Sequence, residues 1–414
     1  MRFRYSAGED GALVRKAVIY TRDEHGINFA DVDSYAVSIV KKLRDFGFET
    51  YIVGGAVRDL ILGKKPKDFD IVSAASPLKI RKVFRNSRII GRRFRLVHVS
   101  FGQKIFEVST FRSLKDGLTS NTFGTVDEDV LRRDFTMNAL LYDPAQQIVV
   151  DYVGGMKDIQ KKLVKPIIPI TTIFTDDPVR MIRAVKYSVA ADFSLPLNLV
   201  WKIKSQSNLL SSISPSRLTE EIFKIVNSPK ASEIVEALYN VGIYSYLQPR
   251  AAKMMRENND FKKSYLQSMS AMANAPVKAS APDKAGAAAK ADSARAGASA
   301  VNSGASNRSG QAVWALVNNY LEDIADWEKG IAEHYKILFQ EARSFILPMS
   351  PPRFEVGKAV RSFFADHGVI VKKMHLMPHF ADRGKHASEG GETGGSAAKK
   401  RRRRRRKPMQ ENVK

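Results

Sequence analysis

Two carboxylates, Asp68 and Asp70, are separated by one residue in a short β-prone segment. Successive side chains of a strand alternate between its two faces, so both carboxylates would share a face while Phe69 and Ile71 point into the core. Magnesium is commonly held by one or two carboxylates together with substrate phosphates, so this pair could seat metal ions for phosphoryl transfer. A solvated pair at the end of a strand would look the same, and both interpretations stay open at this point.

A possible phosphate-binding turn lies upstream of these carboxylates. Gly54 and Gly55 follow a β-prone run, and Arg58 and Asp59 are expected in the first turn of the next helix. Two glycines let the backbone approach a phosphate closely, and the helix N-terminus supplies free N–H donors. Arg58 adds a charged guanidinium group that can donate two parallel hydrogen bonds. This turn could hold a triphosphate beside the metal site. The alternative is a plain strand-to-helix turn in which Arg58 and Asp59 form a surface pair.

Glu107 is a third candidate carboxylate. We expect it in a strand at 105–111, on the face opposite Phe106 and Val108. There it could complete the metal site or deprotonate an attacking hydroxyl group. A solvent-facing strand glutamate is the alternative interpretation.

Two polar clusters further along the chain could contact a nucleotide. The first is dense in basic and polar side chains that suit ribose and phosphate contacts, and it consists of Arg132, Arg133, Asp134 and Asn138. The second follows the helical spacing i, i+3 and i+6, so its members would share one helix face that could read a base edge; it consists of Asp177, Arg180 and Arg183. An ion-pair ladder on a helix surface would have the same spacing.

The elements that must position these residues are predicted from apolar spacing and from glycines. Apolar residues at helical spacing run from Val32 to Phe46, and Gly47 follows as a stop. The first 150 residues mix this helix with a second at 56–62 and with strands at 51–53, 69–72, 96–101 and 105–111. Beyond about residue 176 the pattern is helical, with amphipathic segments at 179–190, 218–226 and 233–238.

Two segments differ in composition from the rest of the chain. Residues 272–311 are dominated by Ala, Gly, Ser, Lys and Asn, which is typical of a linker, although an alanine-rich helix is an alternative. Helical periodicity resumes at Trp314 and continues to about Phe364. From about residue 387 the chain is rich in Gly and Ser and then polycationic, which predicts a flexible tail.

The charge balance predicts a polyanionic partner. The chain has 414 residues and a net charge of +24, from 67 Lys and Arg against 43 Asp and Glu. Nine of these cations form one run, Lys399 to Lys407. Such an excess favours binding to nucleic acid or to an anionic membrane face.

Other function classes are excluded or disfavoured by composition. The absence of Cys excludes disulfides, Cys-ligated zinc and thiol nucleophiles, and it favours a reducing compartment. Neither a secretion signal nor an apolar run of membrane-spanning length is evident, so we expect a cytoplasmic protein without a membrane span.

Six ordered motifs over about 130 residues resemble the class II nucleotidyltransferase family, which comprises bacterial poly(A) polymerases and tRNA nucleotidyltransferases. The motifs are Val53 to Gly63, Asp68 to Asp70, Glu107 to Arg112, Arg132 to Asn138, Asp151 to Asp158 and Asp177 to Ala184. Four features are more similar to the poly(A) polymerases than to the tRNA enzymes: the segments Thr21 to His25, Asn86 to Val99 and Arg217 to Glu221, and the polybasic tail. Two features depart from the family pattern, namely Asp176 in place of Glu and the insertion at 272–311.

The resemblance implies an α+β protein whose nucleotidyltransferase head, with a small mixed β-sheet and helices, precedes an all-α neck and body and a disordered basic tail. The expected division is an N-terminal leader at 1–28, the catalytic head at 29–160, an RNA-binding helical neck and body at 161–271, the linker at 272–311, a continuation of the helical body at 312–386 and the tail at 387–414.

The resemblance also implies a mechanism. Two Mg²⁺ ions would bridge Asp68, Asp70 and the phosphates of ATP, and an RNA 3′-hydroxyl would attack the α-phosphate and release pyrophosphate. The glycine turn with Arg58 would hold the triphosphate, the cluster at Arg132 to Asn138 the ribose and phosphates, and Asp177 with Arg180 the base. Arg217 and Glu221 would brace the helix that reads the nucleotide.

We therefore expect a template-independent adenylyltransferase, a monomer that adds AMP from ATP to RNA 3′ ends and whose tail binds RNA. The closest alternative is a tRNA nucleotidyltransferase that adds CCA with the same carboxylates. From a different class, the chain could be a catalytically inactive RNA-binding protein with the same fold.

Overall fold

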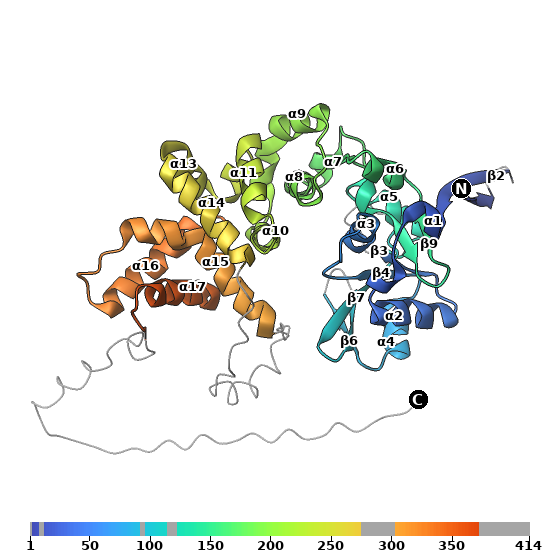
Figure 1. Ribbon diagram of the computed structural model, residues 1–414, viewed down its shortest axis with the longest axis horizontal. Coiled ribbons are helices and arrows are strands. Elements are labelled where there is room, and N and C mark those ends of the chain that lie inside the picture. The colour runs from blue at the N-terminus through green and yellow to red at the C-terminus, as the bar shows by residue number, and fades with distance from the viewer. Residues whose placement is uncertain (1, 8–11, 92–95, 114–121, 275–302, 372–414) are drawn as a thin grey trace, which may run out of the picture. The chain divides into compact units, whose positions relative to one another are not determined.

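The strands of the computed structural model form a single mixed sheet in the order β1-β2-β9-β8-β3-β4-β7-β6-β5 (Figure 1). The structure describes residues 2–7, 12–91, 96–113, 122–274 and 303–371. The strands are β1 (Arg2–Ala7), β2 (Leu13–Tyr20), β3 (Thr50–Val53), β4 (Asp70–Ser73), β5 (Ser87–Ile90), β6 (Leu96–Phe101), β7 (Lys104–Thr110), β8 (Leu141–Asp143) and β9 (Ile148–Asp151). The mixed sheet expected from the sequence is confirmed, and these nine strands make it a large one.

The register of the sheet places the candidate carboxylates. Strands β4 and β7 pair in parallel, with Ile71 opposite Val108, whereas the other strand pairs are antiparallel. Asp70 therefore lies at the level of Glu107 on the neighbouring strand and shares its face of the sheet. Across the next pair, Glu107 is opposite His98.

Helices and strands near the site agree with the sequence predictions because their apolar periodicity is strong. The helices of this half of the chain are α1 (Arg22–His25), α2 (Ser34–Asp45), α3 (Gly55–Ile61), α4 (Pro77–Val83), α5 (Val126–Leu131) and α6 (Gly155–Gln160). The predicted strand at 96–101 coincides with β6, and the predicted helix at 56–62 is α3, displaced by one residue. Asp33 begins α2 by accepting the N–H of Tyr35.

Both faces of the central strands are buried. Ile71, Val97 and Val108 pack in one apolar cluster with Ile39 of α2 and Ile80 of α4. On the opposite face, a second cluster packs side chains of β3 and β4 against α5, and it contains Val53, Val72, Phe111, Val126 and Val130. The sheet therefore holds Asp70 on a rigid support between two packed layers.

Residues 2–7 and 13–20, which the sequence analysis assigned to the N-terminal leader, add strands to the sheet. β1 pairs with β2, and β2 pairs with β9 through Val18 opposite Asp151. The reason is local as well as tertiary: residues 13–20 are rich in β-prone Val, Ile and Tyr, and Ala17 and Tyr20 are buried where β2 packs.

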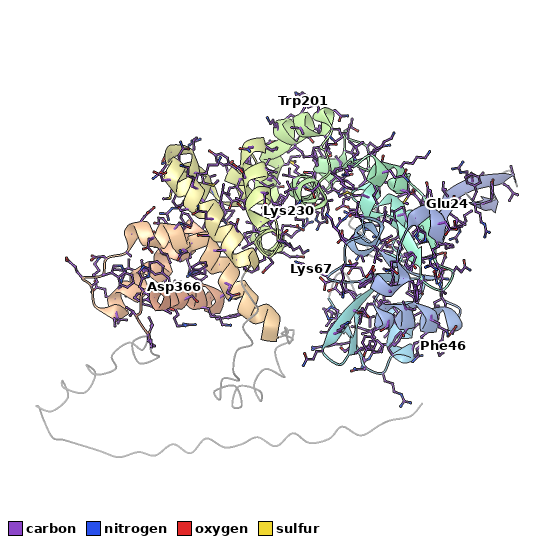
Figure 2. The ribbon with its side chains drawn as sticks, viewed as in Figure 1. Glu24, Phe46, Lys67, Trp201, Lys230 and Asp366 are labelled. Carbon is purple, nitrogen blue, oxygen red and sulfur yellow. The ribbon has the colours of Figure 1, made fainter. Side chains whose placement is uncertain are left out.

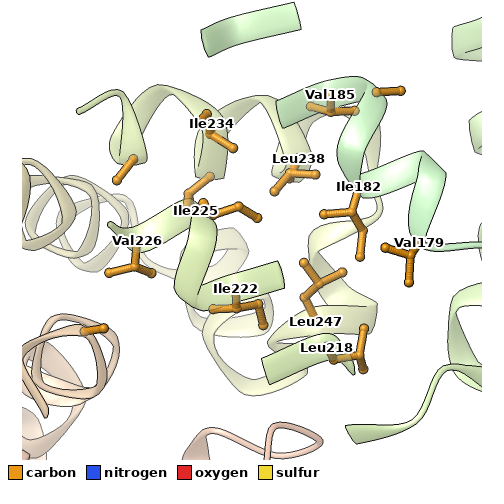
Figure 3. Packing of buried hydrophobic residues seen from close by; sticks show 14 of the residues in the cluster. Val179, Ile182, Val185, Leu218, Ile222, Ile225, Val226, Ile234, Leu238 and Leu247 are labelled. Atoms are coloured by element: carbon orange, nitrogen blue, oxygen red, sulfur yellow. The ribbon is translucent and has the colours of Figure 1, made fainter. Parts of the chain in front are cut away.

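The second half of the described chain is helical. Its helices are α7 (Ile173–Asp176), α8 (Val179–Ala191), α9 (Leu197–Gln206), α10 (Pro215–Val226), α11 (Ala231–Val241), α12 (Tyr244–Leu247), α13 (Pro249–Glu257), α14 (Asn259–Asn274), α15 (Ser303–Ile324), α16 (Ile331–Phe345) and α17 (Arg353–Asp366). Figure 3 shows how α8, α10 and α11 interdigitate their apolar faces, with Ile182, Ile222 and Leu238 in the contact.

Both ends of the expected linker at 272–311 are helical. α14 ends at Asn274, and α15 already begins at Ser303. The sequence pattern missed the start of α15 because Ser, Gly and Asn dominate its first turns. The remainder of the linker (275–302) and the predicted tail (387–414) lie outside the described residues, as does the end of the predicted body from residue 372.

In the part of the chain that the structure describes, no helix is long and apolar enough to cross a membrane.

Candidate active site

One recess of about 340 Å³ brings together most of the residues that the sequence analysis singled out. It is lined by Gly54, Gly55, Arg58, Asp70, Arg132, Arg133, Asp134, Asn138, Asp177, Arg180, Arg183 and Tyr187. These residues come from four places: the β3–α3 turn with the start of α3, the start of β4, the segment from the end of α5 through η2 (Thr136–Asn138), and α8 with Asp177 ahead of it. We call it the nucleotide recess, after the ligand that the sequence analysis expects there.

A second, larger recess of about 660 Å³ shares Gly55, Arg58 and Asp70 with the first and adds Asp59 and Asp68. Its remaining charged lining residues are all basic, namely Lys64, Lys65, Lys67, Lys224 and Lys230. Figure 2 labels two of these lining residues, Lys67 and Lys230. We call it the lysine recess. Asp70 thus lies where the two recesses meet.

The glycine turn brings the backbone against this carboxylate. Gly54 has a φ of 76°, which side chains with a Cβ rarely adopt, and a Cβ at that position would lie 3.7 Å from Asp70 Oδ2. A Cβ on Gly55 would lie 3.5 Å from Arg58 Nη2. The turn therefore presents main chain, rather than side chain, to a ligand beside Asp70 and Arg58.

Arg58 and Asp59 do form a pair, as the alternative interpretation expected, but Arg58 is buried. Its guanidinium donates to Asp59 Oδ1 at 2.7 and 2.9 Å and to Asn138 Oδ1 at 2.8 Å. Asp59 and Asn138 therefore fix the orientation of Arg58 from two sides.

Asp70 carries an unusually basic carboxylate. Its side chain remains open to solvent, yet it lies in a recess among many protein atoms. Burial, followed by the negative charges of Glu107 and Asp68, raises the pKa of Asp70 to about 6, and Arg133 opposes this shift.

The chemistry of Asp68 and Asp70 fits a divalent cation. Both present hard oxygen donors, and within the described residues neither carboxylate makes a hydrogen bond or an ion pair. The raised pKa of Asp70 reflects burial first and then like charges, and a cation would neutralise those charges. The two carboxylates could therefore hold Mg²⁺.

Glu107 is not brought into this ligand set. It lies on β7, is more than half exposed, and its Oε1 is 3.3 Å from His98 Nε2. Among the described residues, no group of three or more His, Cys, Asp or Glu side chains is placed to hold a metal ion. Glu107 still contributes negative charge near Asp70, as the pKa shift of Asp70 shows.

The basic cluster after α5 lines the nucleotide recess. Arg133 pairs with Asp129 at 2.9 Å and donates to the carbonyl of Asn138 at 3.4 Å, whereas Arg132 donates to the carbonyl of Ser113. Burial, and then the neighbouring Arg112, lowers the pKa of Arg132. Because the neighbouring positive charges disfavour the charged form of Arg132, an anionic ligand beside it would stabilise that form.

The second polar cluster differs from its prediction at one residue. Arg180 and Arg183 lie on α8, but Asp177 precedes the helix in an extended conformation, since Pro178 separates it from the first turn. Its carboxylate nevertheless reaches the same recess. Arg180 is buried and donates to the carbonyls of Ile173 and Arg132 at 3.3 and 3.5 Å.

α10 holds this cluster by two ion pairs. Arg217 Nη2 is 2.8 Å from Asp177 Oδ2, and Glu221 Oε1 accepts from Arg183 at 2.8 and 2.9 Å. The other oxygen of Glu221 accepts from Lys186 at 2.9 Å. Arg217 and Glu221 thus connect α10 to Asp177 and to α8. Arg183 also lies 3.8 Å from Asp134.

Sequence reasoning missed Tyr187 and Lys186. Tyr187 lines the nucleotide recess, and the Arg58 guanidinium lies 5.8 Å from the centre of its ring. It follows Arg183 by four residues on α8, so extending the helical spacing would have found it. Lys186 joins the Glu221 ion pairs at the spacing i+3 from Arg183.

Comparison with known proteins identifies related chains. Residues 50–165 match the family described as the poly A polymerase head domain, and residues 192–255 match the family described as a probable RNA and SrmB-binding site of polymerase A. Poly(A) polymerase I of Salmonella typhi is 40% identical over 271 residues, which are 62% of this chain and 58% of that protein. The CCA-adding enzyme of Geobacillus thermodenitrificans is 35% identical over 224 residues, 53% of this chain and 55% of that protein. The similarity thus spans little more than half the length of these curated relatives.

A solved structure shares the fold. The crystal structure of the Bacillus stearothermophilus CCA-adding enzyme in complex with CTP superposes with a TM-score of 0.52 at 24% identity, and the match covers 81% of this chain and 82% of that chain.

Proposed function

Because residues 50–165 and 192–255 match the two poly A polymerase families, and similar proteins include poly(A) polymerases and CCA-adding enzymes, we propose that this chain adds AMP from ATP to RNA 3′ ends and releases pyrophosphate. The observation that carries the proposal is the nucleotide recess, where Asp70 and a glycine turn lie among five arginines: Arg58, Arg132, Arg133, Arg180 and Arg183. A nucleoside triphosphate needs such cations around its phosphates and carboxylates beside its α-phosphate.

Several of these arginines are already oriented by the protein. Arg58 is fixed by Asp59 and Asn138, and Arg133 is fixed by Asp129. Charged donors that are already oriented before the ligand binds do not have to be reoriented during the reaction, so no free energy is spent on that step. These side chains would therefore stabilise the negative charge of the triphosphate and of the departing pyrophosphate.

The carboxylates of Asp68 and Asp70 would hold Mg²⁺, which when bound neutralises phosphate charge and lowers the pKa of a coordinated hydroxyl. Because Asp68 faces the lysine recess and Asp70 faces both recesses, this pair marks the place where nucleotide and RNA end would meet. The RNA 3′-hydroxyl would approach from the lysine recess, whose lysines suit the terminal phosphates of the RNA.

The base would be read by the face of α8 that α10 braces. Asp177 accepts hydrogen bonds, and Arg183 donates them, so together they match a base edge that carries both a donor and an acceptor. Two donors of Arg180 are already used by backbone carbonyls. Arg183 likewise uses two donors on Glu221, so both arginines would be held in position and keep further N–H groups for the base.

Addition of CCA to tRNA is the second candidate, because CCA-adding enzymes are among the relatives of this chain. We expect the pure protein to extend a generic RNA of about 20 nucleotides with ATP and Mg²⁺, since phosphate contacts carry no sequence information. Ordered addition of two C and one A to tRNA that ends before CCA would assign the second function instead. Failure to incorporate any nucleotide would support an inactive RNA-binding protein.

A further inference from the structure

A basic surface covers the outer side of the head where α4 lies beside α2. Between Ile71 and Phe106 the sequence contains no Asp or Glu. Figure 1 shows α2 and α4 next to each other on one side of the sheet, and their residues are in contact. Six exposed cations belong to this region, which we call the α2–α4 surface: Lys41, Lys42, Lys79, Arg81, Lys82 and Arg85.

The charges of the α2–α4 surface are not neutralised by the protein. Within the described residues, none of the six cations forms an ion pair, whereas Lys64 and Lys104 nearby pair with Asp192 and Asp33. α2 carries one carboxylate, Asp45, and α4 carries none. Such an excess of unpaired cations on one surface attracts a polyanion.

A recess on the same surface adds aromatic walls. It has a volume of about 270 Å³ and is lined by Ser38, Lys42, Phe84, Arg85, Asn86, Val99, Ser100 and Phe101. The ammonium group of Lys42 lies 5.0 Å from the centre of the Phe84 ring, and Tyr35, which is 42% exposed, stacks on Phe101 at 4.8 Å. Cations beside aromatic rings form the pattern that binds single-stranded nucleic acid, since phosphates pair with the cations and bases stack.

This surface is separate from the candidate active site. β4 begins at Asp70 and ends at Ser73, and α4 begins beyond that far end, at Pro77. None of the six cations lines the nucleotide recess or the lysine recess. A ligand on the α2–α4 surface would thus lie beyond the opposite end of β4 from the metal-binding carboxylates.

We propose that the α2–α4 surface binds single-stranded RNA upstream of the 3′ end, with phosphates on the cations and a base in the aromatic recess. The proposal rests on the proposed function, because that function brings an RNA chain to the head. RNA fits better than an acidic protein, since the recess between Lys42 and Arg85 offers aromatic walls as well as charge.

The test compares two triple variants that remove the same number of positive charges. Arg81→Gln/Lys82→Gln/Arg85→Gln changes the α2–α4 surface, and Lys157→Gln/Lys161→Gln/Lys165→Gln changes exposed lysines on and just after α6. Binding of RNAs of about 6 and about 30 nucleotides, lengths that bracket a typical single-strand site, is measured at several salt concentrations.

We expect the first variant to bind the longer RNA roughly tenfold more weakly, with a salt slope shallower by about 2, because each of the three cations that neutralises a phosphate contributes about 0.7 to the slope. Its affinity for the short RNA should match the parent, and the α6 variant should match the parent with both RNAs. Hydrogen exchange gives a second readout: amides of residues 77–91 should be protected by the longer RNA and not by the short one.

Three results would overturn the proposal. If both triple variants weakened RNA binding equally, the effect would be one of general charge. If the α2–α4 variant also bound the short RNA more weakly, the changed cations would contact the RNA at its 3′ end. An unchanged affinity for the longer RNA would exclude RNA and leave an acidic protein as the occupant. A parent protein that adds no nucleotide but shows the expected difference in binding would refute the proposed function and retain this surface.

Discussion

At the scale of single residues, the candidate site divides into groups that the protein has already paired and groups that it has left unpaired. Arg58 and Arg183 each have a carboxylate partner that fixes their orientation. Asp68 and Asp70 have none within the described residues. Unpaired carboxylates that repel one another are destabilising unless a cation joins them, so this division is the expected signature of a metal-dependent site.

We predict that Asp68→Asn and Asp70→Asn each lower the rate of AMP addition at least about 10³-fold, because a metal-holding carboxylate is removed while the shape of the side chain is kept. The rate is measured with saturating ATP and RNA, and thermal unfolding checks the fold. Asp260→Asn is the control, since Asp260 lies exposed on α14, outside both recesses. If either Asp variant kept a rate within about tenfold of the parent, the metal assignment would be wrong.

Arg217→Ala should reduce discrimination between nucleotides without unfolding the protein. The Arg217–Asp177 pair is half exposed at Arg217, so it contributes at most about 1 kcal/mol to stability. Its loss would free Asp177, and a polar contact that no longer matches the base changes selectivity by about 1 to 3 kcal/mol. The measurement is the ratio of kcat/KM for ATP and CTP. Arg217→Lys should restore part of the ratio; an unchanged ratio in Arg217→Ala would exclude Asp177 from base recognition.

At the scale of elements, α8 and α10 are joined by an apolar contact and by a buried ionic one. Ile182 and Ile222 pack between them, and Glu221, which is 2% exposed, accepts hydrogen bonds from Arg183 and Lys186. Burial alone would raise the pKa of Glu221, but Lys186, Arg183 and Lys224 together lower it to about 2. The ionised form of Glu221 is therefore the form that the folded protein favours.

Glu221 makes stability depend on acid pH in a defined direction. The pKa of Glu221 is near 4.5 in the unfolded chain and about 2 in the folded one, so the unfolded state binds the proton first as the pH falls. The stabilisation is complete above about pH 4.5 and disappears towards pH 2. We predict that Glu221→Gln lowers the free energy of unfolding by about 3 kcal/mol near neutral pH, and by much less near pH 3, in urea titrations. A difference that stays constant with pH would contradict the ion-pair assignment.

The start of α6 is a second place where one residue fixes two elements. Asp151 accepts the backbone N–H groups of residues 153 to 156 at 2.8 to 3.0 Å, and a Cβ on Gly155 would lie 2.3 Å from the carbonyl oxygen of Thr136. Gly155→Ala should therefore force α6 away from η2 and cost about 1 to 3 kcal/mol in thermal or urea unfolding. Gly330→Ala is the control, because no atom lies within 4 Å of a Cβ there; equal stability of the two variants would refute the close contact.

At the scale of the whole molecule, the described helices from α7 onward share one apolar core with the head. One cluster of buried apolar side chains contains residues from Tyr20 to Phe364. The boundary expected at residue 160 therefore does not interrupt the core, and the arginines of α8 are anchored in the same packed interior as the sheet that carries Asp70.

Deletion of residues 388–414 should weaken RNA binding and leave folding unchanged. It removes nine consecutive cations, Lys399 to Lys407, and no candidate metal ligand. The salt slope on single-stranded RNA should fall by about 0.7 for each phosphate that the tail neutralises in the parent protein, while turnover at saturating RNA stays close to that of the parent. Binding at several salt concentrations checks this prediction. The same salt slope in the truncated protein would show that the tail does not contact RNA.

The sequence by itself predicted the family resemblance, most of the residues that line the two recesses and the elements with strong periodicity. The motifs around Asp68, Arg132 and Arg180 are contiguous in the chain, and the helix at 32–46 and the strand at 96–101 follow local apolar spacing. Such signals need only a short window of sequence.

Only the tertiary structure decided which of these residues meet. The strand β2 was missed because it pairs with β9, whose residues are more than a hundred positions later in the chain. Arg58 contacts Asn138 and Glu221 contacts Arg183 over separations of 80 and 38 residues, and the sheet register brings Glu107 level with Asp70. Residues that are distant in sequence are brought together by burial of apolar surface, which acts on area without regard to sequence separation, so no local pattern records their partners.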